Sequence, residues 1–456
     1  MTSRTVIRTA FEKCLAAVEP RQIVRNKISV SPSSIQISSS HFPLSNSTKI
    51  VLISFGKASI RMARGALDIL KSPLLQKTLV LAPEQQEKEF RSEAKDSEFE
   101  VYFGAKNNLP DEKSIFGTQK IIENIRKFDG KDTIFVFLIS GGGSALFCSP
   151  RPPITLSQKL STIKTLQSHG ATIEELNIIR QKLSIVKGGQ LLNHIKQGQS
   201  VSLLISDVIG DKVDIIASGP TVIPSDKRKS VKEVLEGLGI GEKDLEEVVW
   251  KVLMEKDESP PRHLNPPQNH IISSNIHALR SASEFLTSSG YHTSIITSSL
   301  SGNAAEIGKD FGNLIVSGDS GLLNLQNLQN LQNLTYPSAL LFGGETTVNL
   351  AKNPGKGGRN QEMVLSCFDF LKHQKPAKQF TFLSAGTDGQ DGPTNAAGAI
   401  ISNSDLQIPS PTSSESLANS DSYNFWKTFN GGKNHLITGP SGTNVMDIQI
   451  LLLDEL

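Results

Sequence analysis

Cysteine is scarce in this chain, which has only Cys14, Cys148 and Cys367, far apart and without a CxxC pair. This scarcity excludes a disulfide framework and a thiolate zinc site, and it is typical of an intracellular protein. Long apolar runs are also lacking, since no stretch approaches the roughly 18 uncharged apolar residues that a membrane-spanning helix requires. We therefore expect no membrane partner.

An excess of charge of one sign is lacking as well. Forty-seven Lys and Arg against 45 Asp and Glu leave a net charge of +2, too balanced for a protein that neutralises a nucleic-acid backbone. We expect no nucleic-acid partner. The N-terminus has no signal-peptide hydrophobic region. Arg4 and Arg8 would suit the start of a mitochondrial presequence, but residues 9–18 already have the pattern of a domain helix, so we predict a cytoplasmic location with a mitochondrial one as the alternative.

Short apolar runs alternate with helix-period segments along most of the chain. The runs lie at residues 49–54, 133–139, 201–205, 270–273, 339–342 and 379–383. This alternation predicts an α/β protein with a doubly wound, mostly parallel sheet. Because ligands bind beyond the carboxyl ends of the strands in such sheets, we expect the chemistry at the turns that follow the strands.

The length predicts two or three domains at about 150 residues each, and two is our working number. Residues 255–267 combine four prolines with charge and no periodicity, a composition typical of a linker. We predict a larger N-terminal α/β domain at 1–254 and a smaller α/β domain at 268–456. The Leu-Gln-Asn repeat at 324–334 and the Ser-rich and Asp-rich segment at 402–422 are predicted to be loops outside the core.

A lysine follows the first predicted strand. Residues 50–59 read IVLISFGKAS, so that Gly56 ends a buried strand and Lys57 opens a helix. A helix N-terminus carries about half a positive charge and the ammonium adds another, which suits a phosphate. The segment is not a Walker A loop, because Val51 and Ala58 occupy positions that need Gly and Ser or Thr. Taken alone, Lys57 is better explained as a surface residue.

Three consecutive glycines follow the next buried strand. They are Gly141, Gly142 and Gly143, flanked by the hydroxyls of Ser140 and Ser144. Glycines permit positive φ angles and close backbone approach, so this turn could surround an anion such as a cofactor phosphate. The alternative is a tight strand-to-helix turn that needs glycine only for its shape. The segment does not match GxGxxG, because leucine stands where the third glycine would be, so a dinucleotide fingerprint is unsupported.

Two aspartates follow the third strand in the segment LLISDVIGDKVDIIASGPT. Asp207 comes directly after the strand and Asp211 lies four residues later. This spacing could place two hard oxygen ligands around Mg²⁺, and one carboxylate suffices when phosphates supply the other ligands. Asp is also a common turn residue, so either side chain could cap the backbone instead.

Further polar motifs follow predicted strands in the second half of the chain. Residues 342–366 place Glu345 after a glycine pair, and Arg359 and Asn360 at the start of a helix. A guanidinium offers a planar fork suited to carboxylate or phosphate oxygens, although a solvated helix start would explain an isolated GGRNQE. The turns GTDGQDGPT and TGPSGTNV add Asp388, Asp391, Thr443 and Asn444. Each of these turns is weak evidence alone.

Taken in order, the motifs GKAS, SGGGSAL, SDVIGD, IASGPT, GGETTV, GGRNQE, GTDGQDGPT and TGPSGTNV resemble the class II glycerate kinases, or glycerate 2-kinases, whose C-terminal half is a MOFRL-type domain. The likeness runs from about residue 9 to the C-terminus. It implies ATP-dependent phosphorylation of D-glycerate, two α/β domains with a cleft between them, Mg²⁺ or a similar ion, and no P-loop. It favours the 2-hydroxyl as the acceptor.

The resemblance also implies roles for particular residues. Lys57 and Arg359 correspond to active-site residues of the family, and Asp207 or Asp211 to its carboxylate. We expect Lys57 to act on the phosphates, Arg359 on the glycerate carboxylate or the migrating phosphoryl group, and either aspartate on Mg²⁺ or the attacking hydroxyl. The expected nucleotide contacts are Ser140, Gly141, Gly142, Gly143 and Ser144. The expected substrate contacts are Glu345, Asn360, Asp388, Asp391, Thr443 and Asn444.

Two other functions remain open from the residues alone. A nicotinamide-dependent hydroxypyruvate reductase would act on adjacent chemistry, but the missing GxGxxG turn counts against it. A non-catalytic ligand-binding relative would keep the fold, since fold alone does not prove turnover. The retained charged residues favour the enzyme. The expected partners are D-glycerate and ATP, and the sequence leaves a homo-oligomer open.

Overall fold

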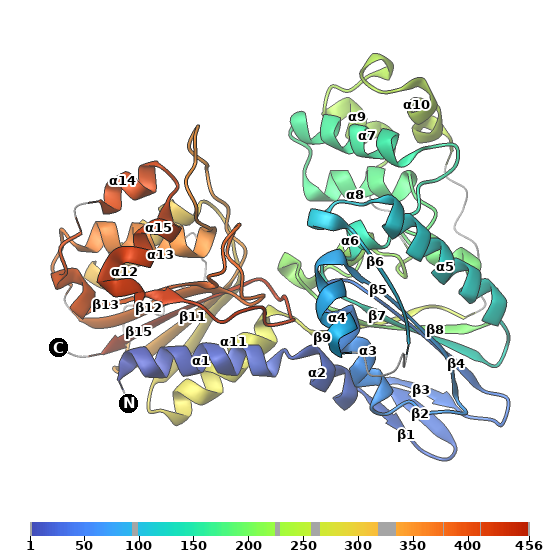
Figure 1. Ribbon diagram of the computed structural model, residues 1–456, viewed down its shortest axis with the longest axis horizontal. Helices are drawn as coiled ribbons and strands as arrows, with labels where there is room; N and C mark the ends of the chain where they lie inside the picture. Colours follow the sequence, from blue (N-terminus) through green and yellow to red (C-terminus); the bar gives the residue numbers. More distant parts are fainter. Residues whose placement is uncertain are drawn as a thin grey trace. The chain divides into compact units, whose positions relative to one another are not determined.

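The computed structural model describes residues 2–93, 99–223, 229–256, 265–317, 334–376, 378–410 and 412–454. The chain forms two compact units (Figure 1). We call Pro20–Ile272 the N-terminal unit, and Met1–Glu19 with Ser273–Leu456 the C-terminal unit. Most of the predicted linker, at 257–264, and residues 324–333 of the Leu-Gln-Asn repeat lie outside the described residues.

The unit boundaries differ from the predicted domain boundaries at two places. Strand β9 (Gln268–Ser273), predicted to open the second domain, hydrogen-bonds to the sheet of the N-terminal unit. Helix α1 (Ser3–Ala17) belongs to the C-terminal unit, where it packs on helix α11 (Asn275–Ser288). The buried face of α1 includes Phe11 and Cys14. An amphipathic pattern predicts a buried face but does not say which sheet covers it.

A six-stranded sheet forms the core of the N-terminal unit, in the order β6-β5-β4-β7-β8-β9. The strands are β4 (Lys49–Phe55), β5 (Leu75–Pro83), β6 (Glu100–Gly104), β7 (Thr133–Ile139), β8 (Gln199–Ile205) and β9. The pairs β6–β5, β5–β4, β4–β7 and β7–β8 are parallel. Strand β7 is buried at every position, as expected for a strand covered by helices on both faces. The predicted mostly parallel α/β sheet is confirmed.

The other elements of the N-terminal unit surround this sheet. The helices are α2 (Pro20–Asn26), α3 (Ser59–Leu67), α4 (Glu87–Glu93), α5 (Glu112–Phe128), α6 (Gly143–Leu146), α7 (Leu156–Ser168), α8 (Ile173–Lys182), α9 (Val231–Gly237) and α10 (Glu247–Met254). Strands β1 (Ile28–Val30), β2 (Ser34–Ile37) and β3 (Ser40–Pro43) make a small antiparallel sheet. Helices α7 to α10 gather around a separate apolar cluster that includes Leu166, Leu176 and Val249 (Figure 1).

A second six-stranded sheet, in the order β10-β11-β15-β12-β13-β14, forms the core of the C-terminal unit. The strands are β10 (His292–Leu300), β11 (Ser338–Gly344), β12 (Gln379–Gly386), β13 (Gly398–Ser402), β14 (His435–Leu436) and β15 (Asp447–Asp454). The pair β10–β11 is parallel, and every other pair in the sheet is antiparallel. Because β15 runs against β11 and β12, its first residue lies beside the last residues of those strands. Gly344 and Gly386 both pair with Asp447.

Helices cover both faces of this sheet. Helices α1 and α11 lie on one face, and α12 (Ala304–Ser317) and α13 (Arg359–Leu371) lie on the other (Figure 1). The segment 402–422, predicted to be a loop outside the core, instead contains α14 (Ser413–Ala418), followed by α15 (Ser422–Thr428). Leu406 and Leu417 of this segment pack against the core. The prediction of a loop was wrong because it weighed the polar composition of the segment and not these two leucines.

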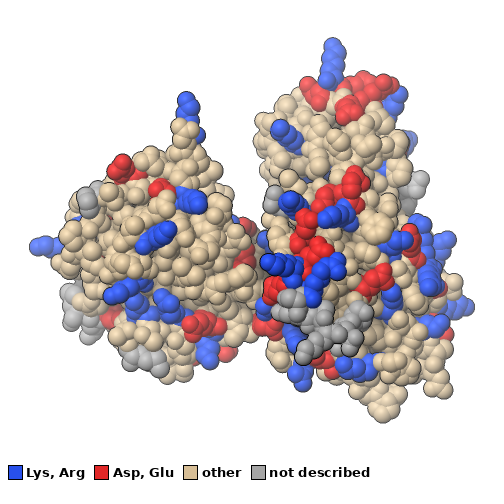
Figure 2. Space-filling model, viewed as in Figure 1, with Lys and Arg blue, Asp and Glu red and all other residues tan. Residues whose placement is uncertain are grey.

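Charged side chains of both signs are mixed on the surface. The face drawn in Figure 2 shows Lys and Arg interspersed with Asp and Glu over both units. Within the described ranges, no helix combines the length and the apolarity that crossing a membrane requires.

The aromatic core of the C-terminal unit predicts a large effect of one substitution. Trp426 is fully buried, packs edge to face on Phe425 and Phe429, and donates from Nε1 to the Gln361 carbonyl at 3.0 Å. Trp426→Ala should lower the free energy of unfolding by about 3–5 kcal/mol, because it opens a cavity and removes a donor. Urea unfolding followed by circular dichroism measures this. The control is Phe116→Ala, because Phe116 is 53% exposed. This change should lower the free energy of unfolding by less than about 1 kcal/mol.

Candidate active site

Three of the predicted motifs follow neighbouring parallel strands of the N-terminal unit. Lys57 follows β4, the glycine turn Gly141–Gly143 follows β7, and Asp207 follows β8. Strand β7 pairs with both of the others. The carboxyl ends of all three strands therefore meet at one edge of the sheet, the edge at which ligands bind in open α/β sheets.

The turns after β4 and β7 touch through their backbones. The Lys57 amide donates to the Gly141 carbonyl at 2.8 Å, and the Ala58 amide donates to Ser140 Oγ at 3.0 Å. Gly56 has a φ of +123°, and a Cβ there would lie 2.3 Å from Ser140 Oγ. Gly56 therefore allows both a left-handed backbone and this approach. The hydroxyl of Ser140, predicted to contact the cofactor, is used to join the two turns.

Lys57 and Asp207 both lie against the glycine turn. A Cβ on Gly142 would lie 3.0 Å from Lys57 Cγ, and a Cβ on Gly141 would lie 2.0 Å from Asp207 Oδ2. Burial raises the pKa of Asp207, while the nearby Lys57 ammonium opposes that rise. A cation, a carboxylate and a backbone without side chains thus meet in one place, an arrangement suited to binding phosphate.

A buried lysine, which the sequence analysis did not single out, lies beneath the same turn. Lys187 is 1% exposed, and its Nζ donates to the carbonyls of Ser144 at 2.8 Å and Phe147 at 3.2 Å. Burial and the charge of Lys159 lower the pKa of Lys187 to about 7. The hydroxyl of Ser144 lies 2.8 Å from that of Ser218. No local sequence pattern indicates that the position of Lys187 is enclosed.

The second predicted aspartate, Asp211, is partly exposed at the end of a short 3-10 helix, with a φ of +53°. Across the described ranges, no group of three or more His, Cys, Asp and Glu side chains is arranged to hold a metal ion. A metal site made by Asp207 and Asp211 therefore stays a prediction. Magnesium needs few protein carboxylates when phosphates are present.

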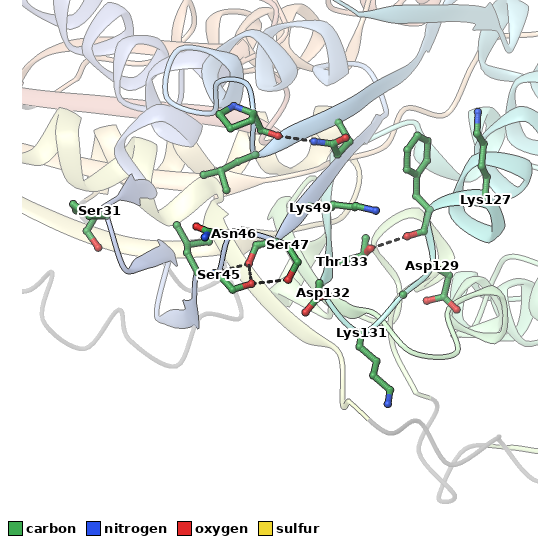
Figure 3. Close-up of a pocket in the computed structure, with 18 residues that line it drawn as sticks. Ser31, Ser45, Asn46, Ser47, Lys49, Lys127, Asp129, Lys131, Asp132 and Thr133 are labelled. Atoms are coloured by element: carbon green, nitrogen blue, oxygen red, sulfur yellow. Dashed lines mark hydrogen bonds between the residues drawn. The ribbon is translucent and has the colours of Figure 1, made fainter.

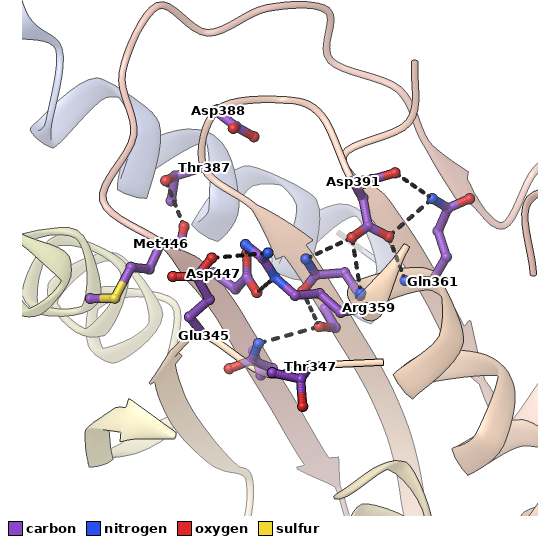
Figure 4. Close-up of polar contacts among 12 residues, drawn as sticks. Glu345, Thr347, Arg359, Gln361, Thr387, Asp388, Asp391, Met446 and Asp447 are labelled. Carbon is purple, nitrogen blue, oxygen red and sulfur yellow. Dashed lines mark hydrogen bonds and ion pairs between the residues drawn. The ribbon is translucent and has the colours of Figure 1, made fainter. Parts of the chain in front are cut away.

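In the C-terminal unit, Arg359 is held between two carboxylates (Figure 4). It is the first residue of α13, and its Nε and Nη2 donate to the two oxygens of Asp447 at 2.5 and 3.0 Å. Its Nη1 lies 3.0 Å from Glu345 Oε1. Burial works against the charge, but the hydrogen bonds that Arg359 donates to Asp447, together with the charges of Asp447 and Glu345, raise the pKa of Arg359. The guanidinium is thus fixed in orientation and fully charged.

Asp447 is the residue of this group that the sequence analysis missed. Its side chain is 1% exposed, and it accepts two hydrogen bonds from Arg359. The predicted site residues lie in turns that follow strands, whereas Asp447 is the first residue of the antiparallel strand β15. An isolated aspartate just before the apolar run IQILLL was the available signal.

Asp391 and Asn360, predicted to contact substrate, are buried. Asp391 accepts from the amides of Asn360 at 3.1 Å and Gln361 at 2.9 Å, so it caps the start of α13 (Figure 4). Asn360 donates to Asp391 and accepts from Ser384 Oγ at 2.6 Å. Both side chains hold the helix that carries Arg359. Burial raises the pKa of Asp391 to about 6, and burial with the charge of Asp391 raises that of Glu362 to about 7.

The remaining predicted substrate contacts fall into two groups. Glu345, Asp388 and Asn444 keep exposed surface, although Asp388 accepts from the Gln390 amide at 3.0 Å and Asn444 from the Met446 amide at 3.1 Å. Thr443 is 4% exposed and donates to the Val18 carbonyl at 2.9 Å. Its hydroxyl therefore ties the loop before β15 to the end of α1.

A cavity of about 710 Å³ lies at the opposite edge of the N-terminal sheet (Figure 3). Its walls include Lys49 and Thr133, the first residues of β4 and β7. Asp129 in this wall accepts from the backbone amides of Lys196 at 2.8 Å and Gly198 at 2.9 Å, so it holds a loop. The cavity is distant from the strand-end turns and is not our candidate site.

Comparisons with known proteins extend over the whole chain. A model of a domain of unknown function, DUF4147, matches residues 6–254, and the MOFRL family model matches residues 338–447. A D-glycerate 2-kinase from Thermotoga maritima is 35% identical over 90% of this chain and 92% of its own. The chain belongs to the glycerate kinase family. An uncharacterised Caenorhabditis elegans protein is 61% identical over 100% of both chains.

The solved structure of a glycerate kinase from Thermotoga maritima matches this chain with a TM-score of 0.80 and 31% identity, covering 98% of this chain and 99% of the other. The family resemblance read from the motifs is therefore confirmed, as is the α/β fold. The named relatives are kinases, and neither is named a nicotinamide-dependent reductase, the enzymatic alternative that the sequence left open.

The contact between Gly141 and Asp207 predicts a coupled pair of substitutions. Gly141→Ala should lower the free energy of unfolding by about 1–3 kcal/mol, because the new methyl overlaps the carboxylate. That penalty should largely disappear in an Asp207→Ala background, since the overlapping atoms are gone. Thermal unfolding of the four proteins measures the coupling. Gly237→Ala, in a helix with nothing within 4 Å of the added Cβ, is the control and should lower the free energy of unfolding in neither background. Equal penalties in both backgrounds would exclude the contact.

The raised pKa of Glu362 predicts a pH-dependent stability difference. In the unfolded chain Glu362 ionises near 4.5, while in the folded protein it keeps its proton up to about 7. Its contribution to stability is therefore complete below pH 4.5 and is lost as pH rises to 7. The free energy of unfolding of Glu362→Gln should therefore rise, relative to that of the wild type, by about 2 kcal/mol when the pH is raised from 5 to 8. Urea unfolding at both values tests this, with the 65% exposed Glu236→Gln as a control expected to show no such change.

Proposed function

We propose that this protein transfers the γ-phosphoryl group of ATP to the 2-hydroxyl of D-glycerate. The observation that carries the proposal is the meeting of Lys57, the glycine turn and Asp207 at the carboxyl ends of three neighbouring strands. The names of the Thermotoga relatives, glycerate kinase and D-glycerate 2-kinase, support the substrate and the acceptor position.

Lys57 and the glycine turn are assigned to the phosphates. At about 4 Å and an effective dielectric near 20, one pair of unit charges interacts by roughly 4 kcal/mol before desolvation is subtracted. A lysine beside a transferring phosphoryl group can therefore lower the activation free energy of the transfer substantially. Gly141, Gly142 and Gly143 have no side chains to obstruct an approaching phosphate.

Asp207, with Asp211 as a second candidate, is assigned to Mg²⁺. The carboxylate of Asp207 fits this role because it is confined against the turn, where burial raises its pKa and a bound cation would stabilise the ionised form. A bound Mg²⁺ supplies charge neutralisation to the phosphate oxygens. Asp207 holds its carboxylate beside the place where those oxygens would lie.

Arg359 is assigned to the carboxylate of D-glycerate. Asp447 fixes the guanidinium through two hydrogen bonds, and Nη1 faces the carboxylate of Glu345, which is 46% exposed. A substrate carboxylate has the same chemistry as that of Glu345 and can replace it at Nη1. Asp388 and Asn444 are the remaining candidates for the hydroxyls of the substrate. The location of the reaction, cytoplasmic rather than mitochondrial, stays a prediction for cell fractionation to test.

Phosphorus NMR tests the proposed reaction and its acceptor position together. With ATP, Mg²⁺ and D-glycerate, the spectrum should lose the γ-phosphate signal and gain that of 2-phosphoglycerate. Formation of 3-phosphoglycerate would contradict the acceptor position. Absence of any new phosphate ester, with folded protein, would contradict the kinase. A parallel incubation with NADH and hydroxypyruvate should leave the reduced-cofactor absorbance unchanged.

Substitution of the two cations should remove activity without removing the fold. Lys57→Met and Arg359→Ala should each lower kcat/KM for D-glycerate by roughly 10²–10³, the equivalent of about 3–4 kcal/mol. Steady-state kinetics with a coupled ADP assay measures the loss. The matched control is Lys49→Met, at the exposed opposite end of the same strand, which should stay within about twofold of wild type. Retained activity in either site variant would contradict the assignment.

A further inference from the structure

A second cavity, of about 410 Å³, lies in the N-terminal unit beside helix α8. Apolar walls come from Ile178, Ile215 and Val222, and the amide side chains of Asn177 and Gln181 line it as well. Ligand sites of about 300–1,000 Å³ that are mostly apolar with a few polar groups are typical for small molecules. This cavity has no role in the binding of phosphate or glycerate described above.

The cavity and the glycine turn are separated by one left-handed turn. Ala217, Ser218 and Gly219 have φ angles of +52°, +64° and +61°. Non-glycine residues in this region cost energy and gather at ligand sites. Ala217 lies against the glycine turn, since a Cβ on Gly143 would be 2.7 Å from Ala217 Cβ. Gly219, two residues later, lines the cavity.

Hydrogen bonds of Ser218 connect the glycine turn to the wall of the cavity. Ser218 Oγ lies 2.8 Å from Ser144 Oγ, at the end of the glycine turn, and donates to Asn177 Oδ1 in the cavity wall at 3.2 Å. Gln181 Nε2 donates to the Ser218 carbonyl at 3.4 Å. Ser218 itself is fully buried, so it links the glycine turn to two residues of the cavity wall through hydrogen bonds without facing either ligand.

The charged residues of the cavity indicate which part of a ligand it can bind. Three acids, Glu174, Glu175 and Asp214, line it together with one cation, Lys229. Glu175 pairs with Lys229 at 2.9 Å, and Glu174 pairs at 3.3 Å with Lys212, which lies outside the lining. The excess of carboxylates disfavours a phosphate or the glycerate carboxylate. An uncharged planar group against the apolar wall, or a sugar hydroxyl beside a carboxylate, is compatible with it.

We propose that this cavity binds the nucleoside end of the phosphoryl donor, with its phosphates extending over the left-handed turn to Gly141–Gly143. The inference rests on the proposed kinase function and adds the site of base and ribose recognition. The adenine ring packs against Ile178, Ile215 and Val222, and the carboxylates face the ribose hydroxyls. The cavity therefore selects a nucleoside triphosphate over inorganic polyphosphate.

A bulky substitution in the cavity separates nucleoside binding from phosphate binding. Ile178→Trp should raise the KM for ATP at least tenfold, while the KM for D-glycerate and inhibition by inorganic tripolyphosphate stay within twofold. The matched control is Ile173→Trp, the same change at an exposed position of the same helix outside the cavity, which should leave all three values unchanged. An ATP KM within twofold of wild type, or equal weakening of tripolyphosphate, would overturn the inference.

Photolabelling tests the wild-type protein independently of how the variant folds. Irradiation with 2-azido-ATP should modify peptides from residues 172–181 or 214–222, and excess ATP should protect them. ATP-protected labelling elsewhere would overturn the cavity assignment while leaving the kinase intact. Wild-type protein that forms no ADP from ATP and D-glycerate would instead overturn the proposed function, and this inference with it.

Discussion

The candidate site depends on one close approach, between the backbone after β4 and the backbone after β7. The amide of Lys57 bonds to the carbonyl of Gly141, and Ser140 bonds to the amide of Ala58. A side chain at Gly56 would prevent this approach. With the two turns joined, Lys57 lies over Gly142 and Asp207 lies against Gly141. The polar groups are thus positioned by backbone contacts of a rigid parallel sheet, and the side chains need little freedom of their own.

The C-terminal unit positions its cation by a different means. Arg359 is oriented by the buried carboxylate of Asp447, and Asp391 and Asn360 hold the helix on which it lies. The guanidinium of Arg359 is half-buried and loses part of its hydration, so the bidentate contact fixes geometry more than it adds stability. Glu345 is the exposed partner and is the one that a substrate carboxylate can replace.

Much of the fold could be predicted because its buried parallel strands are continuous apolar runs. Strands β4, β7 and β8 follow this pattern. Strand β10 has only Ile295, Ile296 and Leu300 as apolar residues among Ser and Thr, and gave no such run. The sequence of α1 could not predict which unit the helix joins, because an amphipathic pattern indicates a buried face and not the sheet that it covers. Helix α14 was not predicted, because the polar composition of residues 402–422 is typical of a loop and Leu406 and Leu417 are too few to make an apolar pattern.

The candidate site was predictable where a motif follows a strand in sequence and less so where contacts are distant. Lys57, Gly141 and Asp207 meet because parallel neighbours end at one edge. Asp447 opens an antiparallel strand, so it does not belong to the turns after strands where the sequence predicts the chemistry. Asp391 has the sequence context of a turn and caps a helix 31 residues away in sequence, which no local pattern encodes.

A crystal structure of the full chain with ADP, Mg²⁺ and aluminium fluoride tests the central claim most directly. The account predicts the fluoride and the phosphates within hydrogen-bond distance of Lys57 Nζ and of the backbone of the turn after β7. Phosphates bound at the amino ends of the strands or elsewhere, with that turn empty, would contradict it.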